Sequence, residues 1–414
     1  MSNSRVTLNS KLTVVSSKPV SSGMVHALSP LDRAMGSHTL HVIFYYENED
    51  KWFESFDLDP LRESLCEVLT LSPTLTGRLG RGPDGGWEVK CNDAGVRVIK
   101  ATVDATLNEW LRSASASEEK LLTAWDDMPH DPTTWPPFRI QINSFEGGGV
   151  AIGVSCSHML GDLTFLASFF KSWSQVYRHV PITHPTLLAN PSLPFPSDSD
   201  APSPTKETNM ATATFKFSAS AIKHRLASLA DTCPDATPFD LLAGLFWTRI
   251  KTKLITLCSD LRSDHSLPFG YLGNALRFST LSLDAGEGGE VELGDAVSAV
   301  HRHLESEGEN SGVYGAQLTC VCMEQLMLVD DDESSSSSSL LYAASFSDKE
   351  KPVHVSCRVE NVEGGGLILV MPSREGGFSR TVTLRLPEDQ LSTLIKDQSI
   401  CDFHPHMLFS SYTN

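Results

Sequence analysis

The sequence predicts an α+β protein made of two domains of similar size. Its 414 residues correspond to two or three domains at about 150 residues per domain. A proline-rich stretch over 184–204 divides the chain into halves, and each half contains strand-like and helix-like segments. The 40% hydrophobic and 20% charged residues are typical of a folded globular protein. We therefore expect a domain over 1–183, a linker over 184–207 and a second domain over 208–414.

The chain is strongly acidic. It carries 33 Lys and Arg residues against 51 Asp and Glu residues, a formal net charge of −18. Such an excess repels nucleic-acid phosphates and anionic membranes at long range, and we do not expect nucleic acid as a partner. A local basic cluster inside a pocket still outweighs distant charges, because salt screens those over about 8 Å. A phosphorylated co-substrate is therefore compatible with the net charge.

Cysteine usage and hydropathy point to a cytoplasmic protein. The nine cysteines are scattered and form no Cys-x-x-Cys pair, which predicts reduced and mostly buried thiols. The first thirty residues lack the charged start and apolar stretch of a secretory signal. No window approaches the roughly 18 uninterrupted apolar residues of a membrane span, so we expect no integral membrane segment.

Three patterned segments in the first half predict secondary structure. Over 61–71, apolar residues recur at the spacing of an amphipathic helix, and Pro73 ends it. Residues 139–145 and 150–155 alternate on either side of a glycine-rich turn, as in a β-hairpin. Over 163–177, apolar and aromatic side chains fall on one helical face. A hairpin is thus followed directly by a packed helix.

His158 lies between the end of that hairpin and the start of that helix. A strand end fixes the position of an imidazole, and its ordinary pKa of about 6.5 suits general-base work. The alternative is a hydrogen-bonded core histidine, which is the commoner role for a histidine considered alone. We take His158 as the candidate general base.

Asp162 follows His158 by four residues and directly precedes the helix. At that position an Asp caps free backbone N–H groups, typically worth about 1 kcal/mol. The spacing leaves open whether the carboxylate contacts His158, pairs with a distant Arg or only caps the helix. The nearby Ser155 and Ser157 lack the Gly-x-Ser-x-Gly pattern of a nucleophilic serine.

The second half contains the densest basic cluster of the chain. An apolar pattern predicts a helix over 239–255, which carries Arg249, Lys251 and Lys253. Arg249 and Lys253 are four residues apart and would share a helical face, with Arg262 just downstream. The cluster is a candidate phosphate-binding site, and the alternative is a solvated helix face.

Other chemistries have little support in the sequence. The histidines and cysteines show neither His-Glu-x-x-His nor zinc-ligand spacing, so no metal is predicted. The glycine-rich pieces match no nucleotide-binding pattern and predict turns. An acidic and serine-rich run over 330–339 predicts a surface loop without chemistry.

Taken together, the motifs resemble those of the plant BAHD acyltransferase family, which uses acyl-CoA donors. The family shares its His-x-x-x-Asp motif with chloramphenicol and carnitine acyltransferases. The resemblance spans nearly the whole chain, and the matching pieces occur in the order of the family at 28–32 (Leu-Ser-Pro-Leu-Asp), 77–79, 158–162, 246–249, 270–275 (Gly-Tyr-Leu-Gly-Asn-Ala), 351–353, 370–373 and 375–377.

The resemblance implies two chloramphenicol-acetyltransferase-like domains, with mixed sheets flanked by helices and an interdomain tunnel. Acyl-CoA would be a co-substrate rather than a bound cofactor, and the protein would be a monomer. His158 would take a proton from an acceptor hydroxyl or amine. Asp162 would be structural and paired with an Arg, either Arg262 or Arg277.

The sequence departs from the family at its second signature. In place of Asp-Phe-Gly-Trp-Gly before Lys351, the chain has Ser-Phe-Ser-Asp-Lys-Glu at 345–350, and Leu163 replaces the usual Gly after the motif. In lacking that signature while keeping His-x-x-x-Asp, the chain resembles the Eceriferum and Glossy type of this family, which is associated with surface-wax formation. That resemblance implies an accessory role beside a fatty-acid elongase condensing enzyme at the endoplasmic reticulum. An acyltransferase and a non-catalytic accessory protein are therefore our two hypotheses.

Overall fold

The computed structural model describes residues 4–54, 60–188, 193, 209–283, 291–306, 313–315, 317–327, 339–362 and 364–412. The chain forms two compact units. The first comprises Met1–Leu193, Arg262–Ala275 and Leu340–Asn361, and the remainder of the chain forms the second. The units are thus not the two contiguous halves expected from the sequence, because two later segments return to the first unit. Most of the expected linker and of the acidic serine-rich run lies outside the described residues.

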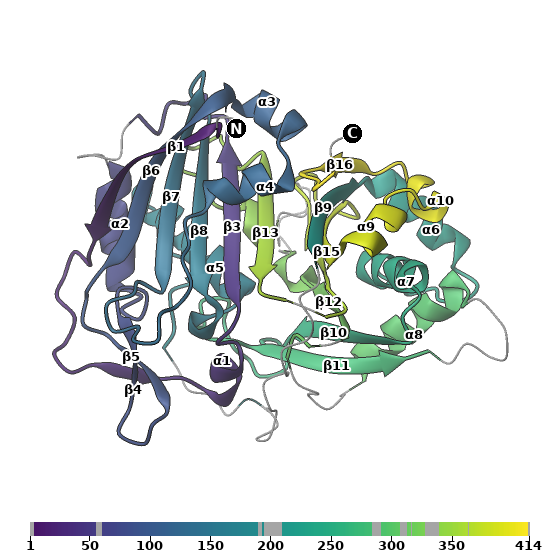
Figure 1. Cartoon of the computed structure of the whole chain (residues 1–414), viewed down its shortest axis with the longest axis horizontal. Helices are drawn as coiled ribbons and strands as arrows, with labels where there is room; N and C mark the ends of the chain where they lie inside the picture. The colour runs from purple at the N-terminus through teal and green to yellow at the C-terminus, as the bar shows by residue number, and fades with distance from the viewer. Residues whose placement is uncertain are drawn as a thin grey trace. The chain divides into compact units, whose positions relative to one another are not determined.

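The first unit is built on a six-stranded mixed sheet (Figure 1). Neighbouring strands are antiparallel except for the second and third, which are parallel. In spatial order, the strands are β1 (Val6–Val14), β6 (Val96–Thr106), β7 (Phe138–Glu146), β8 (Val150–Ser157), β3 (Thr39–Tyr46) and β13 (His354–Glu360). A smaller antiparallel sheet consists of β2 (Val25–Ala27), β5 (Trp87–Lys90) and β4 (Arg78–Arg81).

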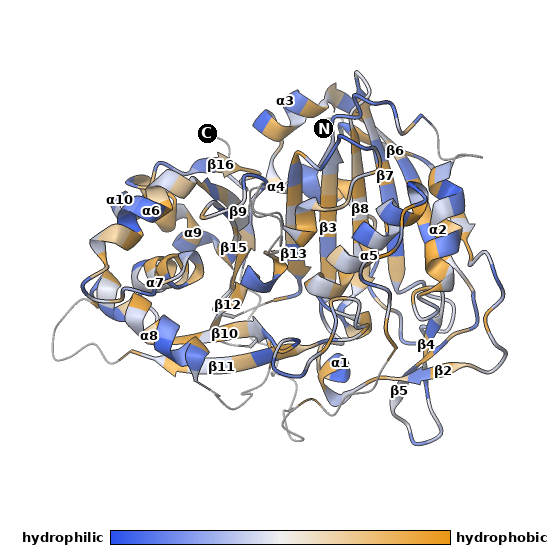
Figure 2. Ribbon diagram, turned by 180° about the vertical axis from the view of Figure 1, so that it is seen from behind, coloured by the Kyte–Doolittle hydropathy of each residue, from blue (hydrophilic) through white to orange (hydrophobic). Residues whose placement is uncertain are grey.

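Helices lie on both faces of the six-stranded sheet. On one face, α2 (Pro60–Thr70) packs against α5 (Leu163–Tyr177). Figure 2 shows hydrophilic and hydrophobic residues side by side along α2, as expected of an amphipathic helix. On the other face lie α3 (Leu107–Ser113) and α4 (Ala116–Glu119), and α1 (Pro30–Ala34) precedes β3 in the chain. The two predicted helices and the predicted hairpin of this unit are confirmed.

The second unit is built on a seven-stranded mixed sheet. Its two parallel pairs are β10 with β12 and β12 with β14, and its other pairs are antiparallel. In spatial order, the strands are β11 (Leu276–Ser282), β10 (Leu254–Asp260), β12 (Leu318–Cys322), β14 (Leu367–Pro372), β15 (Arg380–Pro387), β9 (Met210–Phe217) and β16 (His406–Leu408). The helices are α6 (Ala219–Ser228), α7 (Pro238–Ile250), α8 (Leu293–Glu305), α9 (Glu388–Leu394) and α10 (Gln398–Cys401).

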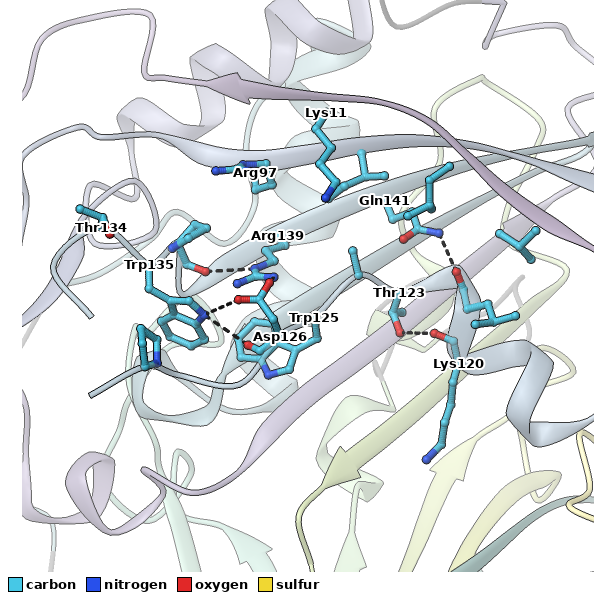
Figure 3. Close-up of a pocket in the computed structure, with 17 residues that line it drawn as sticks. Lys11, Arg97, Lys120, Thr123, Trp125, Asp126, Thr134, Trp135, Arg139 and Gln141 are labelled. Carbon is cyan, nitrogen blue, oxygen red and sulfur yellow. Dashed lines mark hydrogen bonds and ion pairs between the residues drawn. The ribbon is translucent and has the colours of Figure 1, made fainter. Parts of the chain in front are cut away.

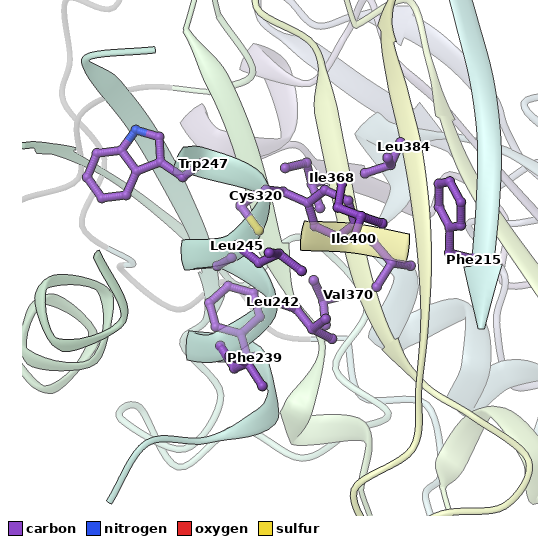
Figure 4. Packing of buried hydrophobic residues seen from close by; sticks show 14 of the residues in the cluster. Phe215, Phe239, Leu242, Leu245, Trp247, Cys320, Ile368, Val370, Leu384 and Ile400 are labelled. Carbon is purple, nitrogen blue, oxygen red and sulfur yellow. The ribbon is translucent and has the colours of Figure 1, made fainter. Parts of the chain in front are cut away.

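The core of this unit forms where α7 packs on the sheet (Figure 4). Leu242 and Leu245 of α7 are fully buried with Ile368 and Val370 of β14. Gly244 lets α8 approach closely, because a Cβ there would lie 3.0 Å from the Val297 side chain. The predicted fold class, two domains with mixed sheets flanked by helices, is confirmed.

The helix expected over 239–255 is wrong at its C-terminal end. α7 ends at Ile250, where Lys251 takes a left-handed conformation with φ 59°, and β10 begins at Leu254. The apolar residues after 250 belong to a strand that pairs with β11 and β12. Arg249 and Lys253 therefore do not share a helical face. Among the described residues, no helix is both long and apolar enough to cross a bilayer.

Candidate active site

His158 begins a short 3-10 turn (His158–Leu160) between β8 and α5. Its backbone N–H donates to the carbonyl of His38 at 3.1 Å, which fixes the residue beside the start of β3. The His158 ring is buried, and its Nδ1 lies 3.1 Å from the Gly161 carbonyl oxygen. A carbonyl oxygen only accepts, so the proton of the neutral ring sits on Nδ1. The basic lone pair is therefore on Nε2.

The surroundings of His158 keep its imidazole neutral near pH 7. Burial lowers the pKa of His158 below its ordinary value of 6.5, and the charge of Asp162 opposes that shift. The neighbouring His38 is also buried, and its pKa is lowered to about 4. A neutral imidazole whose proton lies on Nδ1 has Nε2 as its basic nitrogen, which is the form that a general base requires.

The Asp162 carboxylate lies at the centre of a buried network of hydrogen bonds. It caps α5 by accepting from the Phe165 N–H at 2.9 Å. Two N–H groups of Arg262 donate to its two oxygens, both at 2.9 Å, and the Ala275 N–H donates at 3.0 Å. Both charged side chains are almost fully buried. Of the two predicted arginines, Arg262 is the one that pairs with Asp162.

A second buried carboxylate supports the backbone of His158. The side-chain amide of Asn274 donates to the His158 carbonyl and to Asp32, each at 2.8 Å. The Asn274 N–H also donates to Asp32 at 2.9 Å, and Asp32 caps the first turn of α1 together with Ser29. Burial raises the pKa of Asp32, and these hydrogen bonds oppose the rise. Two of the family-like pieces, 28–32 and 270–275, thus meet behind the candidate base.

Gly273 has a conformational reason to be glycine. Its φ is +129°, a region that side chains disfavour, and a Cβ there would lie 2.8 Å from the Tyr271 hydroxyl. This turn brings Asn274 to the His158 carbonyl. Sequence reasoning included Asn274 in a motif but assigned no role to it or to Asp32. Only their burial as polar residues, at 0% and 3% exposure, identifies them as supports.

The segment that replaces the family's second signature is firmly anchored in the first unit. The Phe346 ring stacks on Trp52 at 4.7 Å between centroids and makes edge contacts with Tyr46, Phe170 and Trp173. The Glu350 carboxylate accepts from the Asn48 N–H and from the Trp52 indole. Although residues 345–350 differ from the family's signature, the strand that follows them, β13, still pairs with β3 in the sheet.

We expect Phe346→Leu to lower the free energy of unfolding by about 2–4 kcal/mol, because four aromatic contacts worth roughly 0.5–1.5 kcal/mol each are lost and leucine refills part of the space. Urea denaturation measures the change. Phe378→Leu is the matched control, since that ring is 38% exposed and should shift stability by less than about 0.5 kcal/mol. Equal effects of the two substitutions would contradict the anchoring role of Phe346.

The predicted phosphate-binding residues lie at the end of α7 in the second unit. Arg249 lies 3.5 Å from the Ser399 hydroxyl, Lys251 is the C-cap residue, and Lys253 is exposed before β10. These three residues are neighbours in the sequence, but they do not share one helical face, because α7 ends at Ile250. Among the described residues, no group of three or more His, Cys, Asp or Glu side chains is arranged to hold a metal.

Comparisons with known proteins agree with this architecture. Residues 4–400 match the family model described as the Transferase family. The chain is 26% identical to Protein ECERIFERUM 26 of Arabidopsis thaliana over 413 residues, 92% of each chain. It is 28% identical to a hydroxycinnamoyltransferase of Narcissus pseudonarcissus over 295 residues, 63% of this chain and 68% of that one.

The fold is also similar to solved structures. Vinorine synthase superposes with a TM-score of 0.73 at 20% identity, covering 94% of this chain and 96% of that one. F. sporotrichioides TRI101, solved with coenzyme A and T-2, gives a TM-score of 0.65 at 15% identity, with 93% and 99% coverage. Given the match of the family model to almost the whole chain, this protein belongs to the Transferase family, the BAHD-type acyltransferases that its motifs resemble.

Proposed function

We propose that this protein transfers an acyl group from acyl-CoA to a hydroxyl or amine acceptor, with His158 as the general base. The observation that carries the proposal is the contact of His158 Nδ1 with the Gly161 carbonyl, which leaves Nε2 as the basic atom. Relatives named as a hydroxycinnamoyltransferase and an acetyl-CoA-benzylalcohol acetyltransferase support the reaction class.

The proposed reaction has two proton transfers through one nitrogen. Nε2 accepts the proton of the acceptor O–H or N–H while the acceptor atom attacks the thioester carbonyl carbon. The resulting tetrahedral intermediate collapses by breaking its carbon–sulfur bond. The leaving thiolate of coenzyme A takes the proton from Nε2, so the imidazole returns to its neutral state. Asp162, Arg262 and Asn274 hold the backbone around the ring and exchange no proton.

Arg249, Lys251 and Lys253 are the proposed contacts for the phosphates of coenzyme A. They are cationic residues gathered within five positions of an acidic chain. Among them, Lys253 is exposed and precedes an ordered strand, whereas Arg249 is half-buried near Ser399. A weaker affinity for coenzyme A in Lys251→Gln or Lys253→Gln, with unchanged folding, is the expected sign of such contacts.

The test is incubation of the purified protein with acyl-CoAs of varied chain length and a mixed panel of alcohols and amines. Release of free coenzyme A that depends on the acceptor supports the proposal. Release of coenzyme A by hydrolysis without an acceptor argues against transfer. Absence of release with every combination of acyl-CoA and acceptor argues against it as well.

A second candidate function is a non-catalytic accessory role beside a fatty-acid elongase condensing enzyme. Two observations favour it. Relatives named ECERIFERUM match more than nine-tenths of the chain, and the family's second signature is replaced by the anchored segment at 345–350. In that role the protein would bind a long acyl chain or the enzyme without transferring the acyl group.

The pH dependence of transfer provides a separate test of the base. Because burial lowers the pKa of His158, the neutral and active form should persist below pH 6.5. We expect kcat/KM to be flat near pH 7 and to fall as the pH drops through a midpoint below 6.5. His38 titrates lower, at about 4, and does not produce this limb. A midpoint at or above 6.5 would contradict the role assigned to the buried ring.

A further inference from the structure

A basic cavity of about 640 Å³ lies on the six-stranded sheet of the first unit (Figure 3). It opens over β1, β6 and β7, on the face opposite α2 and α5. Figure 3 shows Lys11, Arg97 and Arg139 gathered above these strands, with Lys120 farther along the cavity. Its volume is typical of small-molecule sites, which span about 300–1,000 Å³.

The positive charge of this cavity is only partly compensated. Arg139 pairs with Asp126, and Lys120 pairs with Glu360 at 3.1 Å. In the part of the chain that the structure describes, Lys11 and Arg97 make neither an ion pair nor a side-chain hydrogen bond.

The positive charges of Arg97 and Arg139 also act on Arg78, a further buried arginine. Burial lowers the pKa of Arg78, and the charges of Arg97 and Arg139 lower it further. The charges of Arg139 and Arg97 also lower the pKa of Asp126, so this carboxylate offsets part of the positive charge. Arg97 and Lys11 are nevertheless outside any ion pair among the described residues, and two such cations in one cavity mark a site for an anion.

The same cavity also exposes apolar surface. Leu8 on β1 is 54% exposed and Leu121 is 43% exposed, and both line the cavity. A ligand that covers such exposed apolar side chains is stabilised by about 25 cal/mol for each Å² of apolar surface removed from water. Trp125 and Trp135 also line the cavity and meet edge to face at 5.0 Å between centroids. The cavity therefore combines cations with hydrocarbon and aromatic contacts.

We propose that this cavity binds a small amphiphilic anion, a carboxylate or phosphate head carried on a hydrocarbon body. Arg97 and Lys11 would hold the head, because a guanidinium and an ammonium donate charge-assisted hydrogen bonds to such oxygens. Leu8 and Leu121 would cover the hydrocarbon. The site is distinct from His158, and it does not depend on the proposed acyl transfer.

Isothermal titration calorimetry of the full chain with decanoate and decyl phosphate, below their micellar concentrations, tests this site. Decan-1-ol and decyltrimethylammonium supply the same hydrocarbon without the negative head, and inorganic phosphate supplies the head alone. We expect the two amphiphilic anions to bind at least about tenfold more tightly than these three compounds. Equal binding of decan-1-ol or of inorganic phosphate would overturn the proposal.

Variants locate the binding. Lys11→Gln combined with Arg97→Gln should weaken decanoate binding by about tenfold or more, and Leu8→Asp should weaken it as well. Lys18→Gln combined with Arg112→Gln is the matched control, since both residues are exposed in the same unit outside the cavity. His158→Ala should bind decanoate as the unsubstituted protein does. Equal losses in the two double variants, or loss of binding in His158→Ala, would refute this site.

Discussion

Replacement of His158 by Ala is expected to lower acceptor-dependent release of coenzyme A by about 10²- to 10⁴-fold, the usual cost of losing a general base. The loss should appear in kcat, because the ring acts in proton transfer rather than in binding. Single-turnover measurement with saturating acyl-CoA and acceptor checks it. Removing the ring leaves a cavity in a buried site, so circular dichroism and urea denaturation must show that the variant is folded.

His130→Ala is the matched control for this experiment. His130 is exposed in the same unit, so its removal should leave both stability and rate within about twofold of the original values. An unchanged rate in folded His158→Ala would remove the chemical basis of the transferase proposal.

The same variant separates the two candidate functions in the organism. If His158→Ala fully restores the biological output of a strain lacking this protein, the accessory role is favoured. If output collapses while the protein remains folded and abundant, the accessory role fails and transfer is supported.

Replacement of Asp162 by Ala is expected to lower the free energy of unfolding by about 3–5 kcal/mol, the usual cost of breaking a buried ion pair. The substitution leaves the Arg262 guanidinium buried without its carboxylate. It also removes the cap of α5 and the acceptor of the Ala275 N–H. Urea denaturation measures this loss. Asp348→Ala is the matched control, because that carboxylate is 90% exposed beside Arg178 and should cost less than about 1 kcal/mol.

A double-mutant cycle tests whether the pair acts as a unit. Arg262→Met combined with Asp162→Asn should cost less than the sum of the two single losses, because neither charge is then left buried alone. Additive losses would contradict the pairing. Since Asp162 helps to hold the turn that carries His158, folded Asp162→Asn should lose kcat. The pH midpoint of the rate should also move to lower pH, because the charge that opposes the effect of burial on the pKa of His158 is removed.

The local patterns of the sequence were sufficient for the elements around the candidate base. The alternation around a glycine turn predicted the hairpin of β7 and β8, and the 3.6-residue period predicted α2 and α5. These signals succeed because the sheet and the helices each bury one continuous face. The position of His158 followed directly, since it is fixed by the end of a strand and the start of a helix.

The same kind of pattern failed at the end of α7. The apolar residues around 250–255 fit a helical period and a short buried strand equally well, and pairing with β11 and β12 decided the outcome. The proposed shared face of Arg249 and Lys253 depended on that helix and is lost with it.

By itself, the sequence determined the fold class, the family and the place of a histidine at the end of a buried strand. Only the tertiary structure decided that Arg262 pairs with Asp162, that Asn274 and Asp32 brace the His158 carbonyl, and that Gly161 sets its tautomer. Residues about one hundred or more positions apart make most of these contacts, and periodicity carries no information about such distances. They form because buried charges and carbonyls each need a partner, and only the folded chain shows which partner is within reach.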